Sequence, residues 1–418
     1  MSAQRPPSVD KLARSLTDVG LPHPMLVEAA RTAIEAGDPE LARPLAVATA
    51  RRMLRPVINA TGTLLHTNLG RAPMAWTQPE RYTNLELDLT TGERGSRMAT
   101  AGALIAKACG AEDAIIVNNC AAAVLLVLGG LADGKDVVVS RSELVEIGGG
   151  FRIPEVMARS GARLVEVGTT NRTRVGDFAA AVDDPGNAVG VVLSVHQSNY
   201  KIVGFTEAPT TTELAALAPP LVVDIGSGLI DSRCPWIKGN PPGWLAEEPA
   251  ARQTLEAGAG LVVFSGDKLF GGPQAGIIAG DAELVARCAK HPLARALRPG
   301  ALVLGALQAT ALAYLANDSD AIPFWRMAAI EVDALKARAE AVTNATAIPT
   351  MATPGGGTLP GVEMPSYGVK VRGNHRETLR NLDTPIIARI EDGDTVLDMR
   401  TIHPNDDQMV NDALGALG

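Results

Sequence analysis

Short, nearly continuous apolar runs alternate with alanine-rich stretches between residues 58 and 300 of this 418-residue chain. Runs that are apolar at almost every position suit strands buried on both faces of a sheet. Their alternation with helical stretches is typical of βαβ units, so the pattern predicts an α/β fold with a mainly parallel, doubly covered sheet. We expect seven strands, at residues 114–119, 136–140, 162–168, 189–196, 221–226, 261–266 and 275–280.

The segment before this region is predicted to be helical. Ser8 and Asp38 are plausible N-caps for the first and third of three short helices, and Pro44 predicts a kink or a restart in the third. Three short helices bury little surface on their own. We therefore expect residues 1–57 to form a small helical domain that docks on something or serves a partner.

The pattern changes again after residue 300. Two alanine-rich helices, at residues 301–318 and 328–345, are followed by a turn cluster at 354–361. Two strands with a hairpin at Glu391–Asp394 come next. The chain is thus predicted to contain a large α/β domain at 58–300 and a small α+β domain at 301–418.

Composition and charge exclude several classes of protein. The net charge of −8 disfavours a bulk electrostatic binder of DNA or RNA, although a local basic patch remains compatible with it. No apolar run reaches the ~20 residues of a membrane span, and the first residues lack the apolar core of a secretory signal. The four cysteines lack zinc-site spacing, so we expect no metal site and a reducing, cytoplasmic location.

The sharpest local motif is FSGDKLFGGPQAG, at residues 264–276. Lys268 follows an apolar strand, with Ser265 before it and a glycine-rich turn behind it. Enzymes that use pyridoxal phosphate often present their Schiff-base lysine in this way, because the amine must attack an aldehyde at the mouth of a sheet. The alternative for a single lysine is an ordinary surface position in a loop.

A carboxylate and a helix start complete the pattern. Asp224 ends the strand of LVVDIGSG, where open α/β sheets bind ligands and where a carboxylate can pair with the pyridine nitrogen. Asn119, Cys120 and Ala121 connect another strand to an alanine-rich helix, whose N-terminus suits a phosphate group. Asp224 is alternatively a turn or N-cap residue, and Cys120 a small buried one. The order of these elements predicts the type I fold of pyridoxal-phosphate enzymes.

Long strings of the chain resemble one known family, the bacterial selenocysteine synthases, or L-seryl-tRNA(Sec) selenium transferases. These strings are VINATGTLLHTNLGRAP (57–73), RSELVEIGGGFRIPEVMARSGARLVEVGTTNRT (141–173), VHQSNYKIVGFTE (195–207), DIGSG (224–228), FSGDKLFGGPQAGIIAG (264–280) and RALRPG (295–300). The resemblance runs from the N-terminal helices to PIIARIEDG. It implies a cytoplasmic pyridoxal-phosphate enzyme that converts seryl-tRNA(Sec) to selenocysteinyl-tRNA(Sec).

The resemblance also implies roles for individual residues. Lys268 would hold pyridoxal phosphate and remove the Cα proton of the seryl group, and Asp224 would keep the pyridine nitrogen protonated. The serine hydroxyl would be lost from Cβ as water, and selenium from selenophosphate would add there. Arg71, Arg295 and Arg298 would meet this anionic donor, in keeping with the fixed fork of an arginine. For Arg295 and Arg298, a solvated helix face is the alternative.

Other residues lie in the same motifs with less definite roles. Ser227 and Ser265 are candidate phosphate contacts, and His196 is placed beside the ring or the substrate unless it is a structural histidine. Roles stay open for Asn199, for His66 and Asn68, and for Glu143 and Glu146 with the glycines at 148–150, where the site and a subunit interface are both compatible. The stretch Pro299–Gly300–Ala301 departs from the family pattern by lacking a basic residue, which puts a donor or RNA contact in question.

The resemblance further implies that residues 1–57 recognise the tRNA and that the protein is a homo-oligomer built from dimers. This segment carries 8 Lys and Arg against 6 Asp and Glu, with Arg43, Arg51, Arg52 and Arg55 on its third helix and just after it. A small basic patch suits RNA phosphates. Positive charge that complements a helix C-terminus is the alternative.

Two other functions remain in competition. One is a pyridoxal-phosphate lyase or aldolase that acts on a free amino acid or an amino sugar acid. The other is a non-catalytic protein of the same fold that binds RNA or a partner, and Lys268 and Asp224 argue against it. The N-terminal segment and the family motifs favour the selenium transferase.

Overall fold

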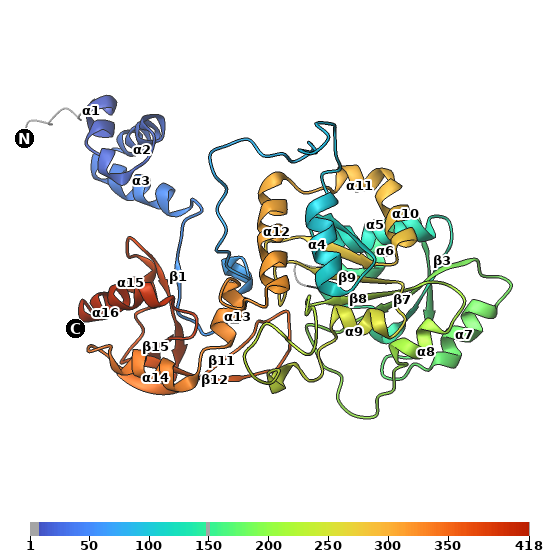
Figure 1. Ribbon diagram of the computed structural model, residues 1–418. Helices are drawn as coiled ribbons and strands as arrows, with labels where there is room; N and C mark the ends of the chain where they lie inside the picture. Colours follow the sequence, from blue (N-terminus) through green and yellow to red (C-terminus); the bar gives the residue numbers. More distant parts are fainter. Residues whose placement is uncertain (1–7, 148–150, 418) are drawn as a thin grey trace, which may run out of the picture. The chain divides into compact units, whose positions relative to one another are not determined.

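The computed structural model describes residues 8–147 and 151–417, and the chain divides into two compact units (Figure 1). The first unit comprises Met1–Ile58 together with Glu377–Ile387. The second unit comprises Asn59–Arg376 and Ala388–Gly418. The predicted N-terminal segment therefore shares its unit with a short piece of chain that lies more than 300 positions later.

Helices α1 (Val9–Arg14), α2 (His23–Glu35) and α3 (Ala42–Arg51) form the first unit around a small aliphatic core. Ser8 caps α1 as predicted, because its hydroxyl accepts a hydrogen bond from the Lys11 amide. Asp38 caps a short 3-10 turn (Pro39–Leu41), and α3 then begins at Ala42. The predicted restart thus comes two residues before Pro44, which lies in the first turn, where proline is tolerated.

The later piece of chain in the first unit binds the end of the N-terminal segment. Arg51 donates a hydrogen bond to the Asn381 carbonyl, and Arg55 donates one to the Asp383 carbonyl. The strands β1 (Ile58–Asn59) and β13 (Ile386–Ile387) pair, and α15 (Arg376–Arg380) lies just before this strand in the chain. Two of the basic side chains are therefore engaged within the unit.

A seven-stranded sheet is the centre of the second unit, and all seven predicted strands are in it. The order is β2-β10-β9-β8-β7-β3-β6. Pairing is parallel among β9, β8, β7, β3 and β6, whereas β10 runs antiparallel to both of its neighbours. The bounds are β2 (Asp113–Val117), β3 (Asp136–Ser140), β6 (Arg163–Val167), β7 (Val189–Val195), β8 (Leu221–Gly226), β9 (Leu261–Ser265) and β10 (Gly276–Gly280).

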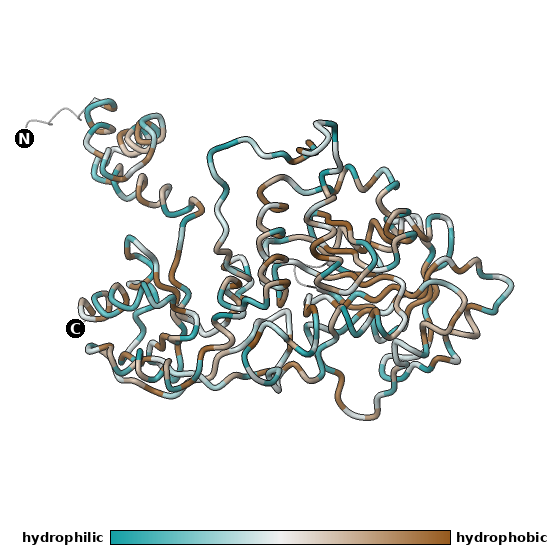
Figure 2. Tube along the Cα trace, in the orientation of Figure 1, coloured by the Kyte–Doolittle hydropathy of each residue, from teal (hydrophilic) through white to brown (hydrophobic). Residues whose placement is uncertain are grey.

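Each face of this sheet has its own hydrophobic core, as the continuous apolar runs require. Successive residues alternate between the two cores: Val138 and Val192 face one, whereas Val137 and Val191 face the other. Figure 2 shows the strands as a concentration of hydrophobic chain in this unit. One core includes α4 (Ala99–Cys109), α7 (Val175–Asp183), α8 (Thr211–Ala215), α9 (Ala251–Glu256), α12 (Ala301–Leu315) and α13 (Pro323–Ala328), and the other α5 (Cys120–Ala132), α6 (Ile153–Arg159) and α10 (Ala282–Lys290).

The C-terminal part of the second unit contains a four-stranded antiparallel sheet in the order β11-β12-β15-β14. The predicted hairpin is confirmed, because Glu391 at the end of β14 (Arg389–Glu391) pairs with Asp394 at the start of β15 (Asp394–Asp398). Helices α14 (Val332–Glu340) and α16 (Asp407–Gly415) belong to the same region.

Two strands of this sheet are absent from the predicted pattern, β11 (Thr346–Ala352) and β12 (Met364–Val371). Pro349 interrupts the first and Pro365 comes near the start of the second, and proline argues against a strand in a sequence. Pro349 is tolerated because β11 is an edge strand, and Pro365 lies outside the stretch 368–371 over which β12 also pairs with β15. In the described part of the chain, no helix is both long and apolar enough to cross a membrane.

Candidate active site

A cavity of about 190 Å³ lies where the strands β7, β8 and β9 end and where β10 and α5 begin. This is the carboxyl edge of the parallel strands, where open α/β sheets bind their ligands. Eight predicted site residues line the cavity: Arg71, Asn119, Cys120, Ala121, His196, Asp224, Ser265 and Lys268. The fold thus brings together residues that lie up to 197 positions apart, from Arg71 to Lys268.

Lys268 and Asp224 are both almost completely buried, at 5% and 3% exposure. The Oδ1 atom of Asp224 accepts a hydrogen bond from the Gly226 amide at 2.9 Å and lies 3.6 Å from the Cys120 thiol sulfur. Burial raises the pKa of Asp224, and the positive charge of Lys268 opposes this rise. Burial also raises the pKa of Cys120 well above its usual value, with the Asp224 charge acting in the same direction. Cys120 is therefore a neutral thiol beside the carboxylate.

The loop that carries Lys268 is held from two sides. The Leu269 amide donates a hydrogen bond to the Ser227 carbonyl at 2.8 Å, which joins this loop to the one that follows Asp224. On α12, the Tyr314 hydroxyl donates a hydrogen bond to the Phe270 carbonyl at 2.9 Å and accepts one from the Trp325 indole. Aromatic residues are only 3% of the chain, and several of them gather under this loop. These hydrogen bonds hold the backbone of the loop directly after Lys268 in place.

The first residues of α5 and the Asn119 cap line the cavity. The side chain of Asn119 caps the helix by accepting a hydrogen bond from the Ala122 amide at 2.8 Å. The first amides of a helix have no acceptor within the helix, so they are available to an anion. Gly276 on β10 lets the two backbones approach closely, because a Cβ atom there would overlap the Asn119 carbonyl. This explains the glycine at position 276.

Arg71 reaches the cavity from a strained turn. Its backbone is left-handed (φ 63°), which is uncommon for a residue other than glycine. The turn is held by a hydrogen bond from the Arg71 amide to the His66 carbonyl and one from the Ala72 amide to the Asp267 carbonyl. The guanidinium forms an ion pair with Asp267 at 2.8 Å. Asp267, which precedes Lys268 directly in the sequence, is a cavity residue that the motif analysis did not single out.

Ser227 lies beside the cavity residues in sequence but is completely buried, and its hydroxyl oxygen has no hydrogen-bond partner among the described residues. Ser265 lines the cavity directly. His66 is half-buried, and its Nδ1 atom has no hydrogen-bond partner within the described part of the chain. Asn68 is exposed in the 3-10 turn Thr67–Leu69. Neither His66 nor Asn68 lines the cavity.

Arg295 and Arg298 line a different cavity, of about 420 Å³. Arg94 and Arg97 also line it, and its one glutamate, Glu86, binds Arg97 at 2.8 Å and Arg298 at 3.4 Å. Arg97 and Arg94 lower the pKa of Glu86, with Arg97 contributing most. Within one chain, the structure therefore does not bring Arg295 and Arg298 to Lys268.

The sequence that departs from the family pattern lies next to this second group of arginines. The Pro299 carbonyl accepts a hydrogen bond from Arg97 at 3.2 Å. Gly300 is the N-cap residue of α12, and Ala301 begins that helix. Arg295 itself lies on α11 (Pro292–Ala296). The altered stretch thus forms a helix start.

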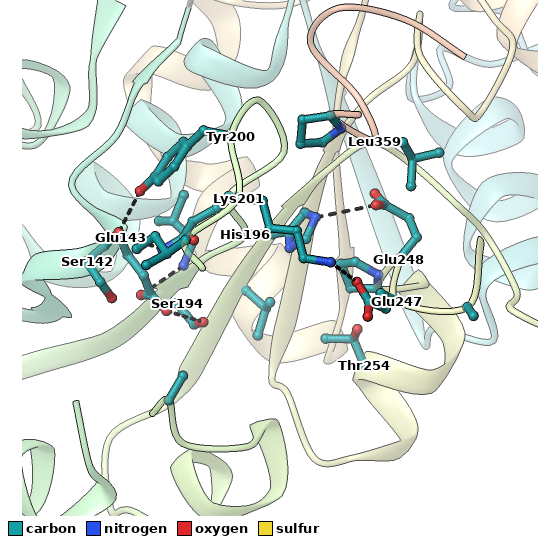
Figure 3. Close-up of a pocket in the computed structure, with 18 of the residues that line it drawn as sticks. Ser142, Glu143, Ser194, His196, Tyr200, Lys201, Glu247, Glu248, Thr254 and Leu359 are labelled. Atoms are coloured by element: carbon teal, nitrogen blue, oxygen red, sulfur yellow. Dashed lines mark hydrogen bonds and ion pairs between the residues drawn. The ribbon is translucent and has the colours of Figure 1, made fainter. Parts of the chain in front are cut away.

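A larger cavity, of about 630 Å³, adjoins the first and shares Val195 and His196 with it (Figure 3). Glu143 lies in its wall and accepts hydrogen bonds from the Ser194 hydroxyl and the Val195 amide, both at 3.1 Å. Burial raises the pKa of Glu143 to about 7 despite these two hydrogen bonds. Glu143 therefore holds the end of β7, directly before His196.

Two other predicted residues, Glu146 and Asn199, do not line this cavity. Glu146, on the two-residue strand β4 (Glu146–Ile147), forms an exposed ion pair with Arg152 at 2.8 Å on β5 (Phe151–Arg152). Asn199 donates a hydrogen bond to the Glu146 carbonyl at 2.8 Å, and its Oδ1 atom is buried without a partner among the described residues. The glycines at 148–150 lie outside the described residues.

The groups around the smaller cavity fit pyridoxal phosphate. A buried amine on Lys268 suits its aldehyde, and a buried carboxylate on Asp224 suits its ring nitrogen. The N-terminus of α5 and the Ser265 hydroxyl, which line the cavity, suit its phosphate. Ser227 is not among the lining residues. Fold and site together define a pyridoxal-phosphate-dependent enzyme of the type I fold.

Comparison with known proteins identifies the family. The family model described as L-seryl-tRNA selenium transferase matches residues 57–403. The L-seryl-tRNA(Sec) selenium transferase of Moorella thermoacetica is 45% identical over 395 residues, covering 87% of this chain and 82% of that protein. The protein of the same name from Carboxydothermus hydrogenoformans is 43% identical over 376 residues, covering 83% and 78%. The chain belongs to the L-seryl-tRNA selenium transferase family.

A solved structure supports the fold separately. The structure of D-glucosaminate-6-phosphate ammonia-lyase superimposes with a TM-score of 0.58 at 21% identity, over 86% of this chain and 95% of that one. At this identity the similarity concerns the fold alone.

Proposed function

We propose that this protein converts seryl-tRNA(Sec) to selenocysteinyl-tRNA(Sec), using pyridoxal phosphate in the cavity of Lys268 and Asp224. The single observation that carries the proposal is the convergence of the family's motif residues on that cavity, from Arg71 to Lys268. When bound, pyridoxal phosphate supplies an electron sink that stabilises negative charge at the Cα of an amino acid.

Each residue of the cavity has a proposed role that follows from its chemistry. Lys268 holds the aldehyde carbon and takes the proton from the seryl Cα. Asp224 holds a proton at the ring nitrogen, and its carboxylate is kept in place by the Gly226 amide. The N-terminus of α5 and the Ser265 hydroxyl hold the phosphate. The serine hydroxyl would leave Cβ as water, and the selenium of selenophosphate would then bond to Cβ. Water would hydrolyse the selenium–phosphorus bond, so that phosphate is released.

The selenium donor is proposed to be selenophosphate, an anion that arginines recognise. Arg71 is the arginine of the cavity itself, and Asp267 aims its guanidinium. Arg295 and Arg298 line a separate cavity that carries four arginines. We propose that they meet the donor in a homo-oligomer built from dimers, in which a neighbouring copy brings them to the active site.

The first unit is the proposed tRNA-binding part. Arg51 and Arg55 are held by backbone carbonyls, and Arg43 forms an ion pair with Asp18 at 2.8 Å. Arg52 is exposed at the end of α3 and is the arginine of this group best placed to meet an RNA phosphate. A cytoplasmic location accords with a substrate that is an aminoacylated tRNA.

A turnover assay tests the proposal. The purified protein receives pyridoxal phosphate and selenophosphate, with seryl-tRNA(Sec), seryl-tRNA(Ser) or free serine in parallel reactions. We expect selenocysteine to form on the first tRNA and on neither of the other two substrates. Ammonia or a keto acid released from a free amino acid, without any selenocysteine, would instead place the protein among the lyases.

A further inference from the structure

His196 forms part of the wall between the two cavities, since its side chain lines both of them. Its backbone is tied to the active site, because the His196 amide donates a hydrogen bond to the Asp224 carbonyl at 2.8 Å. Its imidazole extends toward the larger cavity, where the Nε2 atom lies 3.4 Å from the Oε2 atom of Glu248 (Figure 3). The ring orientation therefore depends on a residue outside the cofactor cavity.

Glu248 is unusually deeply buried for a glutamate, with a side chain only 2% exposed. Its Oε1 atom has no hydrogen-bond partner among the described residues. A buried carboxylate is costly unless a cation or several donors compensate for the lost water. The His196 imidazole is the group that Glu248 faces, so the structure keeps this carboxylate against the ring despite that cost.

Glu248 comes from the loop that follows the 3-10 turn Gly243–Leu245. Its amide donates a hydrogen bond to the Leu245 carbonyl at 3.0 Å, so the backbone is held as well as the side chain. Glu248 lines the larger cavity and does not line the cavity of Lys268. His196 is one of the two residues that the cavities share, and its ring contacts Glu248, so we expect an effect of Glu248 on the cofactor to pass through His196.

We propose that Glu248 is a positioning residue that orients the His196 imidazole at the wall of the cofactor cavity. The proposal rests on the proposed function, because it needs pyridoxal phosphate in the smaller cavity. It explains why the Glu248 carboxylate is buried, which neither the sequence motifs nor the hydrogen bonds of the active site account for. A carboxylate that fixes a ring nitrogen of histidine sets both the tautomer and the direction of the ring.

The chain offers a matched control in the preceding residue. Glu247 also lines the larger cavity, and its carboxylate pairs with Lys201 at 2.5 Å instead of with His196. Its side chain is 81% exposed. Replacing either glutamate by glutamine removes the same charge from the same cavity, but only one replacement releases the histidine.

The test is the affinity of the full-length apoprotein for pyridoxal phosphate, measured by absorbance titration. We expect Glu248→Gln to weaken binding about tenfold, within the range of couplings seen between contacting residues. Glu247→Gln should stay within about twofold of the wild type. Glu248→Asp, which keeps the charge on a shorter side chain, should recover part of the loss.

A double-mutant cycle separates positioning from a general structural role. If Glu248 acts through His196, Glu248→Gln should add no further loss of affinity in a His196→Asn background. Unchanged affinity in Glu248→Gln, or a full tenfold loss that persists without the histidine, would overturn the proposal. If Glu248→Gln does not fold, the cycle is run with Glu248→Asp. Failure of the wild type to bind pyridoxal phosphate would instead count against the cofactor assignment.

Discussion

At the scale of residues, burial sets the chemistry around the cavity. Asp224 is a carboxylate at 3% exposure whose pKa burial raises and the Lys268 charge lowers. Ionised Asp224 therefore depends on Lys268 or on a protonated ring nitrogen nearby. Cys120 remains a neutral thiol for the same reason, because burial disfavours its thiolate. The site thus keeps a negative charge only where a positive partner is available.

Motifs at the ends of strands predicted Lys268 and Asp224, and the family resemblance added Arg71, which reaches the cavity from a turn. Glu248 and Asp267 were missed. Lys268 and Asp224 could be found because an apolar strand precedes each of them. Glu248 comes from a loop between residues 227 and 250 that has no periodic pattern, so only the fold reveals its contact with His196. Asp267 had a signal, its place beside Lys268, but its ion pair with Arg71 spans 196 positions.

Glu143 carries a pH-dependent prediction. Burial raises the pKa of Glu143 from its usual value of 4.5 to about 7 in the folded protein. The folded state therefore keeps a proton that the unfolded state loses, so this stabilising contribution is present below pH 4.5 and is lost as the pH rises to 7. Glu143→Gln removes the titration. It should raise the free energy of unfolding relative to the wild type by up to about 3 kcal/mol at pH 8, and far less at pH 4.5.

Thermal unfolding of both proteins across this pH range measures the effect of Glu143. The exposed Glu146 is the control, and Glu146→Gln should show a difference from the wild type that does not grow between pH 4.5 and 8. A Glu143→Gln variant whose difference from the wild type is the same at both pH values would contradict the assignment.

At the scale of elements, the site depends on where strands end and where one helix begins. The seven apolar runs were predictable as strands because both faces of each are buried. Their spatial order was not, because pairing is decided by packing among distant segments: β10 lies between β2 and β9 and runs against both. The strands β11 and β12 were missed because their prolines conceal the pattern. Arg295 belongs to a family motif but does not line the cavity of Lys268. It lies on α11, and within one chain this helix places it in the cavity that contains Glu86.

The start of α5 gives a prediction with two readouts. Asn119→Ala removes the cap and should cost about 1 kcal/mol of stability. Asn119→Asp keeps a capping oxygen, so it should melt close to the wild type, but its negative charge should weaken pyridoxal phosphate binding severalfold by repelling the phosphate. Melting temperature and cofactor titration measure the two effects. Wild-type cofactor affinity in Asn119→Asp would place the phosphate elsewhere.

At the scale of the whole molecule, two units divide the proposed tasks. The second unit contains the cofactor cavity, and the first presents an exposed Arg52 in a segment with a small positive charge. The sequence predicted the helical character of residues 1–57, since caps and apolar spacing are local signals. It did not predict that Glu377–Ile387 joins the same unit, because nothing local connects segments so far apart.

Binding of the tRNA tests this division. Arg52→Gln should weaken binding of seryl-tRNA(Sec) and reduce the salt dependence of that binding by about one phosphate contact. Lys290→Gln, an exposed charge on α10 in the second unit, is the matched control and should leave both unchanged. Filter binding at several salt concentrations provides the measurement. If the two variants lose affinity equally, net charge would be responsible and not the first unit.

The most direct test of the central claim is to locate the lysine that binds the cofactor. The protein is loaded with pyridoxal phosphate, reduced with borohydride and digested, and the modified peptide is identified by mass spectrometry. We predict modification at Lys268, its loss in Lys268→Ala, and its persistence in Lys201→Ala, which removes a lysine of the adjoining cavity. Stoichiometric modification of another lysine, or undiminished modification of Lys268→Ala, would contradict the account.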